Sequence, residues 1–194
     1  VVSDPCLGEL LMYDPPTKKV TDIASFDLKT EGGPNGFAYD KDNKWLYVVT
    51  MNTGLLCPSA KVKPNVTDNI TSLFRFNTLG TKFGKRETIE TGFGLFGDGM
   101  AFDKHGNLYV VVDTVKNVAL QESKVMVLRS GEKKMVPFVA FAKDTIIANV
   151  AFGRGPLGET TMYGALLAIP PFTNSDKRGV VKFEVGVSGL GLLL

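Results

Sequence analysis

Short runs of alternating apolar and polar residues recur along the chain, separated by polar turns. Gly36–Val49 and Gly99–Val111 have the same pattern, in which an apolar run after a glycine is followed by a polar turn and a second apolar run. A weaker third copy begins at Asn149–Gly153 and continues at Met162–Leu166. Two apolar runs around a tight polar turn predict a β-hairpin. Repeated hairpins are typical of a propeller or a solenoid.

The spacing of the copies predicts how the chain is divided. From Ala38 to Ala101 is 63 residues, and from Ala101 to Ala151 is 50. A four-stranded propeller blade takes about 40–50 residues, and a polar insertion at 52–69 lengthens the first interval. We therefore expect one partial domain over 1–194, with blades at about 33–92, 96–142 and 146–190, and the outer half of another blade at 8–28.

The predicted fold class is all-β, with about three and a half blades and little helix. Such a set does not close a ring, and an uncovered blade would leave an open sheet edge and an apolar face. The missing blades would come from the same polypeptide or from a second chain.

Composition narrows the classes of partner. The chain has 44% hydrophobic and 22% charged residues and a net charge of +2. No Lys/Arg cluster suggests a nucleic-acid surface, and no apolar run approaches the roughly 20 residues that span a bilayer. We expect neither nucleic acid nor membrane as a partner.

Two features favour a secreted or extracellular protein over a cytoplasmic one. Asn65 and Asn69 each begin a glycosylation acceptor triplet in the polar insertion. Cys6 and Cys57 either form a disulfide in an oxidising compartment or are two unpaired small hydrophobic residues. The sequence leaves both readings of the cysteines open.

Polar residues stand at equivalent positions before the first strand of each repeat. They are Asn35, Asp98 and Asn149. Equivalent strand starts of a propeller converge on its axis, so these side chains form a candidate site, although Asn-Gly and Asp-Gly are also ordinary turn sequences. His105, the one histidine, falls in a predicted hairpin turn and is expected to have no catalytic role.

Three segments give the chain a resemblance to a known family. They are Gly33-Pro34-Asn35-Gly36, Gly97-Asp98-Gly99-Met100-Ala101-Phe102-Asp103 and Gly179-Val180-Val181-Lys182-Phe183-Glu184-Val185. Together they resemble the C-terminal part of the regucalcin/gluconolactonase family, which includes the luciferin-regenerating enzymes. The resemblance implies a six-bladed propeller with one divalent cation, usually calcium, at the mouth of its central channel.

The resemblance also implies roles for single residues. Asn35 matches a metal ligand, Asp98 a metal ligand that is also the general base, and Asn149 a residue near the substrate. The expected function is metal-dependent hydrolysis of a small lactone or related ester. The family's Glu ligand has no counterpart here, because Glu9 belongs to an outer strand. The alternative is a non-catalytic propeller that binds a ligand or protein through its rim loops.

Overall fold

The computed structural model describes residues 1–54, 56–57, 65, 68–78, 83–116, 119–141, 145–167 and 178–190. These residues form antiparallel β-sheet, with one 3₁₀ turn, η1, at Gly155–Leu157. None of the helical structure described is long and apolar enough to cross a membrane. The strands are β1 (Val2–Asp4), β2 (Glu9–Asp14), β3 (Lys19–Ser25), β4 (Gly33–Tyr39), β5 (Trp45–Met51), β6 (Ser72–Asn77), β7 (Arg86–Thr91), β8 (Phe96–Phe102), β9 (Leu108–Lys116), β10 (Ala119–Leu128), β11 (Val136–Ala140), β12 (Ile146–Phe152), β13 (Thr161–Leu167) and β14 (Gly179–Glu184).

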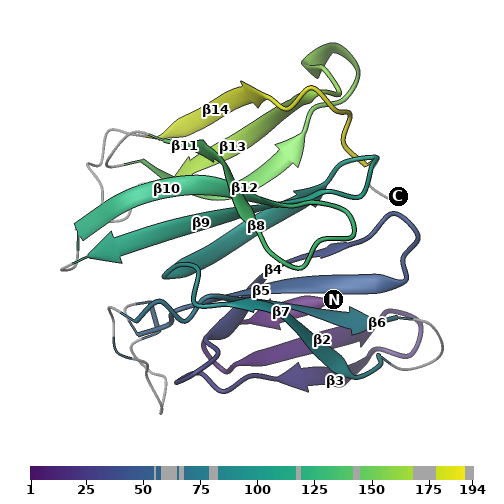
Figure 1. Cartoon of the computed structure of the whole chain (residues 1–194). Helices are drawn as coiled ribbons and strands as arrows, with labels where there is room; N and C mark the ends of the chain where they lie inside the picture. Colours follow the sequence, from purple (N-terminus) through teal and green to yellow (C-terminus); the bar gives the residue numbers. More distant parts are fainter. Residues whose placement is uncertain are drawn as a thin grey trace.

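The strands form four consecutive groups that lie one above another, from β1–β3 at the bottom of Figure 1 to β12–β14 at its top. Within each group, every strand pairs with the next one in the sequence. A single pair, Met51 with Phe96, joins the β4–β7 and β8–β11 groups into one continuous sheet. This curled arrangement is a partial β-propeller, and the predicted all-β class is confirmed.

In each of the first two repeated units, an aspartate directly after the first strand stabilises the hairpin turn. Asp40 Oδ1 accepts hydrogen bonds from the backbone N–H groups of Lys44 and Trp45, at 2.7 and 3.0 Å. In the second repeat, Asp103 Oδ1 accepts from the N–H groups of His105 and Asn107, both at 2.9 Å. Such side-chain bonds to the backbone favour a turn over continued strand. His105 accordingly lies exposed in a hairpin turn, as predicted.

Apolar clusters fill the spaces between neighbouring groups, and an edge-to-face aromatic pair spans each space. These pairs are Phe26–Phe74, Tyr47–Phe102 and Tyr109–Phe152, whose ring centroids lie 5.6, 5.3 and 5.8 Å apart. The strand residues beneath them, such as Leu46, Val110 and Ile147, are fully buried. The core is therefore a series of layers between blades.

The inner strands β1, β4, β8 and β12 lie side by side, and glycines make this possible. A Cβ atom on Gly33 would lie 2.0 Å from the carbonyl oxygen of Pro5, and one on Gly36 would lie 2.0 Å from that of Asp98. The Ser3 hydroxyl donates to the Asn35 carbonyl at 2.7 Å. β1 precedes the predicted 8–28 range, so the first group has a third strand that contacts β4.

Cys6 and Cys57 form a disulfide, which decides between the two readings that the sequence left open. It connects the β1–β2 turn to the segment after β5 and closes a loop with a sequence separation of 51 residues. In the chain-entropy model, a loop of that length stabilises the fold by about 4 kcal/mol. The bond fixes the first group against the second.

Candidate functional site

Asn35 and Asp98, which the sequence predicts to converge, are in contact. Asn35 Nδ2 donates to Asp98 Oδ1 at 3.2 Å and to the Gly97 carbonyl at 3.1 Å. The two side chains come from adjacent inner strands, β4 and β8. Their partial burial leaves an amide and a carboxyl group together at one end of the strands.

Bulges in the strand pairing lie at these residues. On β4, pairing passes from Pro34 opposite Thr50 to Phe37 opposite Val48, so Asn35 and the following glycine face a single residue of β5. The same irregularity on β8 lies between Gly97 and Met100 and contains Asp98. A bulge turns a side chain out of the regular alternation of the strand. The repeated Asn-Gly and Asp-Gly sequences thus place both side chains by the same local device.

Burial controls the electrostatics of Asp98. It raises the pKa of the Asp98 carboxyl to about 7, against a smaller lowering by the hydrogen bond from Asn35. Desolvation acts in this direction because it disfavours the charged carboxylate. A carboxyl group that titrates near neutrality is suited to accepting and returning a proton.

Asn149 lies on the inner strand β12, next to β8, the strand that carries Asp98. A Cβ on Gly99 would lie 1.9 Å from Asn149 Oδ1, so the amide packs directly over that glycine. The same oxygen accepts a hydrogen bond from the Val150 N–H at 2.8 Å, and the residue is exposed. Its predicted role in substrate binding stays a prediction.

Asp113 is a second buried carboxyl group near the site. Only 1% of it is exposed, and its Oδ1 has no hydrogen-bond partner among the described residues. Burial raises its pKa to about 8, with a smaller raising by the charge of Asp98 and a lowering by the hydrogen bond with Ser123. The sequence signal was an aspartate that ends a run of valines. By strand register its counterpart in the first repeat is Met51.

The donor set can be compared with what a calcium ion requires. Ca²⁺ takes six to eight oxygen ligands. Asn35 and Asp98 carry an amide and a carboxylate oxygen donor on side chains that are in contact through the Asn35 nitrogen. In the described part of the chain, no group of three or more His, Cys, Asp or Glu side chains is placed to hold a metal. The donor types present therefore fit part of a calcium shell, and the remaining ligands would have to be water or residues outside this set.

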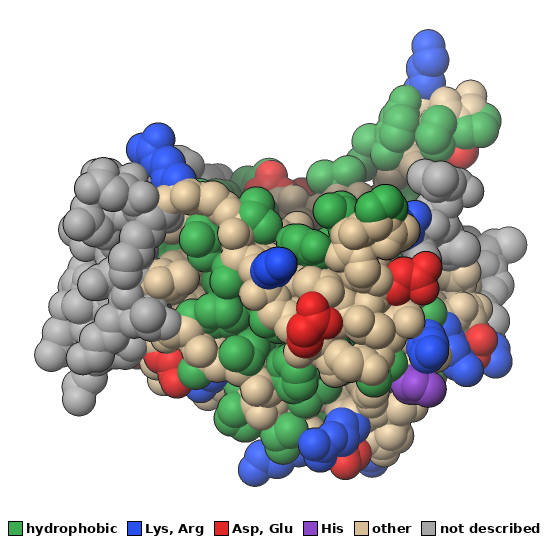
Figure 2. All heavy atoms as spheres, turned by 90° about the horizontal axis from the view of Figure 1, so that it is seen from above, with side chains coloured by type: hydrophobic (Ala, Val, Ile, Leu, Met, Phe, Trp, Pro, Cys, Tyr) green, Lys and Arg blue, Asp and Glu red, His purple; other side chains and the backbone are tan. Residues whose placement is uncertain are grey.

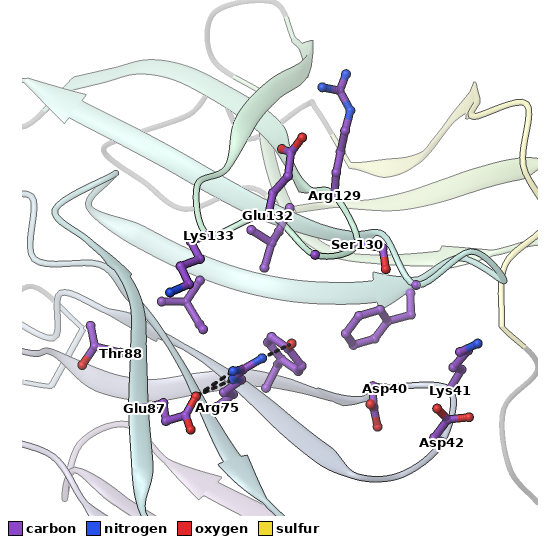
Figure 3. Close-up of a pocket in the computed structure, with 16 residues that line it drawn as sticks. Asp40, Lys41, Asp42, Arg75, Glu87, Thr88, Arg129, Ser130, Glu132 and Lys133 are labelled. Atoms are coloured by element: carbon purple, nitrogen blue, oxygen red, sulfur yellow. Dashed lines mark hydrogen bonds and ion pairs between the residues drawn. The ribbon is translucent and has the colours of Figure 1, made fainter.

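A separate cavity of about 440 Å³ lies between the β4–β7 and β8–β11 groups, at their hairpin turns (Figure 3). Arg75 is fixed there by an ion pair with Glu87 at 2.7 Å and by stacking over the Trp45 ring, 4.1 Å from its centroid. Lys133 and Ser130 extend from the turn above it in Figure 3. None of the predicted site residues lines this cavity.

The predicted glycosylation sites lie only partly within the described residues. Asn65 and Asn69 are both exposed, as a glycan acceptor must be. Val66 and Thr67 of the first triplet, like most of the insertion between 52 and 69, lie outside the described residues. Attachment of a glycan stays a prediction.

Comparison with solved structures identifies the architecture. A gluconolactonase from Xanthomonas campestris, described as important in glucose secondary metabolic pathways, matches 80% of this chain with a TM-score of 0.51 and 16% identity. The chain has the gluconolactonase-type propeller fold. It spans 40% of the length of that enzyme, which agrees with a partial ring of blades.

A second structure is a structural-genomics target described as an unconfirmed gluconolactonase. The match covers 95% of this chain and 70% of the target's chain, with 17% identity and a TM-score of 0.45. No protein-family model matches the sequence, and no curated protein matches it. At 16% identity, the likeness to the gluconolactonase shows the fold of this chain and nothing about its activity.

Proposed function

We propose that this chain is part of a metal-dependent hydrolase that opens a small lactone or a related ester. The observation that carries the proposal is the contact of Asn35 with the half-buried Asp98 across two bulged inner strands. The gluconolactonase-type fold supports it, because in this architecture inner-strand starts face the channel.

Each residue has a role in the proposed chemistry. A divalent cation, with calcium the best match to the oxygen donors, would polarise the lactone carbonyl and acidify a water molecule. Asp98 would accept the proton from the attacking water, and Asn35 would hold the Asp98 carboxylate by its amide hydrogen bond. Asn149, on the neighbouring strand, would contact the substrate.

The rest of the site would lie in blades beyond these 194 residues. The family resemblance implies a Glu ligand there, supplied by the same polypeptide or by a second chain. The disulfide and the two exposed acceptor asparagines favour a secreted, glycosylated protein.

Calorimetric titration with Ca²⁺ tests the metal site directly. We expect the chain to bind calcium weakly, because its donor set is partial, and Asp98→Asn to abolish the binding by removing the anionic ligand. Asn35→Ala should weaken binding more than it lowers the melting temperature. Asp42→Asn, in an exposed hairpin turn, is the matched control and should leave binding unchanged.

Two results would contradict the metal site. One is the absence of any calcium binding, which would favour the non-catalytic propeller that acts through its rim loops. The other is binding of equal strength in wild type and Asp98→Asn, which would place the ion elsewhere.

A further inference from the structure

A cavity of about 520 Å³ lies along the inner strands, directly beyond the predicted site residues. Three consecutive residues of each strand line it: Phe37–Tyr39 on β4, Met100–Phe102 on β8 and Val150–Phe152 on β12. These segments begin two residues after Asn35, two after Asp98 and one after Asn149. The cavity and the predicted site therefore share the same three strands.

The wall of this cavity is apolar. Eight of the nine residues that the inner strands contribute to the lining are Phe, Ala, Met or Val, and the ninth is a tyrosine. Polar residues line the cavity where the hairpin turns begin, among them Lys41, Asn43 and Arg154. The hydroxyl groups of a sugar ring would lose water here and gain few partners, which is unfavourable. An alkyl chain would lose contact with water and gain apolar contacts, which is favourable.

The three walls are held by contacts within this chain. Gly36 lies against the Asp98 carbonyl, and Gly99 lies against Asn149. These contacts fix β4, β8 and β12 at their present separation. The apolar lining is therefore a property of the described strands themselves.

The strands also give the cavity a length. The part of β8 that lines it, from Met100 to Phe102, is two residue steps long, or about 7 Å at about 3.3 Å per residue. An extended chain advances about 3.5 Å for every three bonds, so this length accepts roughly six bonds.

We infer that the substrate of the proposed hydrolase is an apolar lactone with an aliphatic tail of up to about six carbons. The lactone ring lies at Asn35 and Asp98, and the tail runs along β4, β8 and β12. This assignment rests on the proposed function and narrows its small lactone to a lipophilic one.

The test is a titration of the 194-residue chain, with Ca²⁺ present, monitored through backbone amide resonances. The probes are δ-decalactone, δ-valerolactone, which has the same ring without the tail, and 1,5-anhydroglucitol, a stable polyhydroxylated ring. We expect δ-decalactone to bind at least tenfold more tightly than either of the others, with the largest shifts at Ala101 and Ala151.

Two matched variants locate the tail. Ala151→Asp places a charge in the cavity, whereas Ala165→Asp places one on β13 outside the lining, and both alanines are exposed residues of the same sheet. We expect the first to reduce δ-decalactone affinity at least tenfold and the second to leave it unchanged, with both variants folded by circular dichroism.

The outcomes separate this inference from the proposed function. Equal affinity for δ-decalactone and δ-valerolactone, or equal effects of the two variants, would overturn the apolar tail site while calcium binding stands. Tail-dependent binding that neither a chelator nor Asp98→Asn alters would overturn the metal-dependent function, and with it the assignment of the lactone as substrate.

Discussion

At the scale of single residues, two buried carboxyl groups dominate the chemistry of this molecule. Asp98 and Asp113 both have pKa values raised by burial, to about 7 and about 8. The folded chain therefore keeps protons that the unfolded chain releases from about pH 4 upward. Stability is fully present below the unfolded pKa and declines as the pH rises toward the folded values.

This gives a prediction for the metal-free chain. The melting temperature should fall by several degrees between pH 5 and pH 9, since about 1 kcal/mol shifts the melting temperature of a domain this size by roughly 2–4 °C. Asp113→Asn should flatten the decline, because an amide carries no ionisable proton. Differential scanning calorimetry at a series of pH values checks both. An unchanged slope in Asp113→Asn would show that this carboxyl group does not titrate as its burial indicates.

The sequence predicts some of these residues better than others. Asn35 and Asp98 could be paired in advance because each occupies the same place in a repeated unit. The burial and coupling of Asp113 could not, because they depend on how β8 and β10 place Asp98 and Ser123 beside it. The bond between Cys6 and Cys57 depends likewise on how two distant loops approach each other.

At the scale of elements, close approach of the inner strands determines which residues are tolerated. Gly36 faces the backbone carbonyl of Asp98, which is part of a strand and has little freedom to move. A side chain there would force β4 and β8 apart. The repeated hairpins were predictable from residue periodicity, whereas β1 was not, since three residues are too few to give a period.

Gly36→Ala tests this packing. We expect it to destabilise the chain by about 1–3 kcal/mol, the usual cost of overpacking. Gly131→Ala is the comparison: nothing lies within 4 Å of its added Cβ, and only its positive φ of 82° opposes the change. The second substitution should cost about 1–2 kcal/mol, the penalty of a left-handed conformation for a residue with a Cβ. Urea unfolding measures both, and a smaller effect at Gly36 would mean that the inner strands separate easily.

The disulfide gives a second prediction at this scale. The double variant Cys6→Ser, Cys57→Ser should lose about 4 kcal/mol of unfolding free energy, as expected for loop closure over this length. Reduction of the wild-type chain should produce the same loss, and reduction of the double variant should change nothing. Urea unfolding with and without a reducing agent checks this, and a loss well below 1 kcal/mol would show that the bond adds little.

At the scale of the whole molecule, the arrangement is an open stack of blades. The end seen from above presents hydrophobic side chains interspersed with a few charged ones (Figure 2). Val180, Leu157 and Leu167, in the group that forms this end, are 69%, 60% and 40% exposed. If the chain is part of a complete ring, as proposed, another blade would cover this end of the stack.

Activity should depend on completing that ring. The 194-residue chain alone should not hydrolyse lactones, because it supplies ligands to one side of the cation. A complete ring that contains this chain should be active and metal-dependent. In it, Asp98→Asn should abolish turnover and His105→Ala should leave it unchanged. A pH-stat assay with and without chelator checks these outcomes, and chelator-insensitive hydrolysis would contradict the metal-dependent mechanism.

The pairing of every strand with its neighbour in the sequence has a consequence for biosynthesis. A hairpin can form as soon as its two strands have left the ribosome, because its pairing requires no residue that comes later in the sequence. Cys57 emerges before the second repeat begins at Gly99. The disulfide to Cys6 can therefore form while the rest of the chain is still being translated. The later blades would then fold against two strand groups that are already covalently linked.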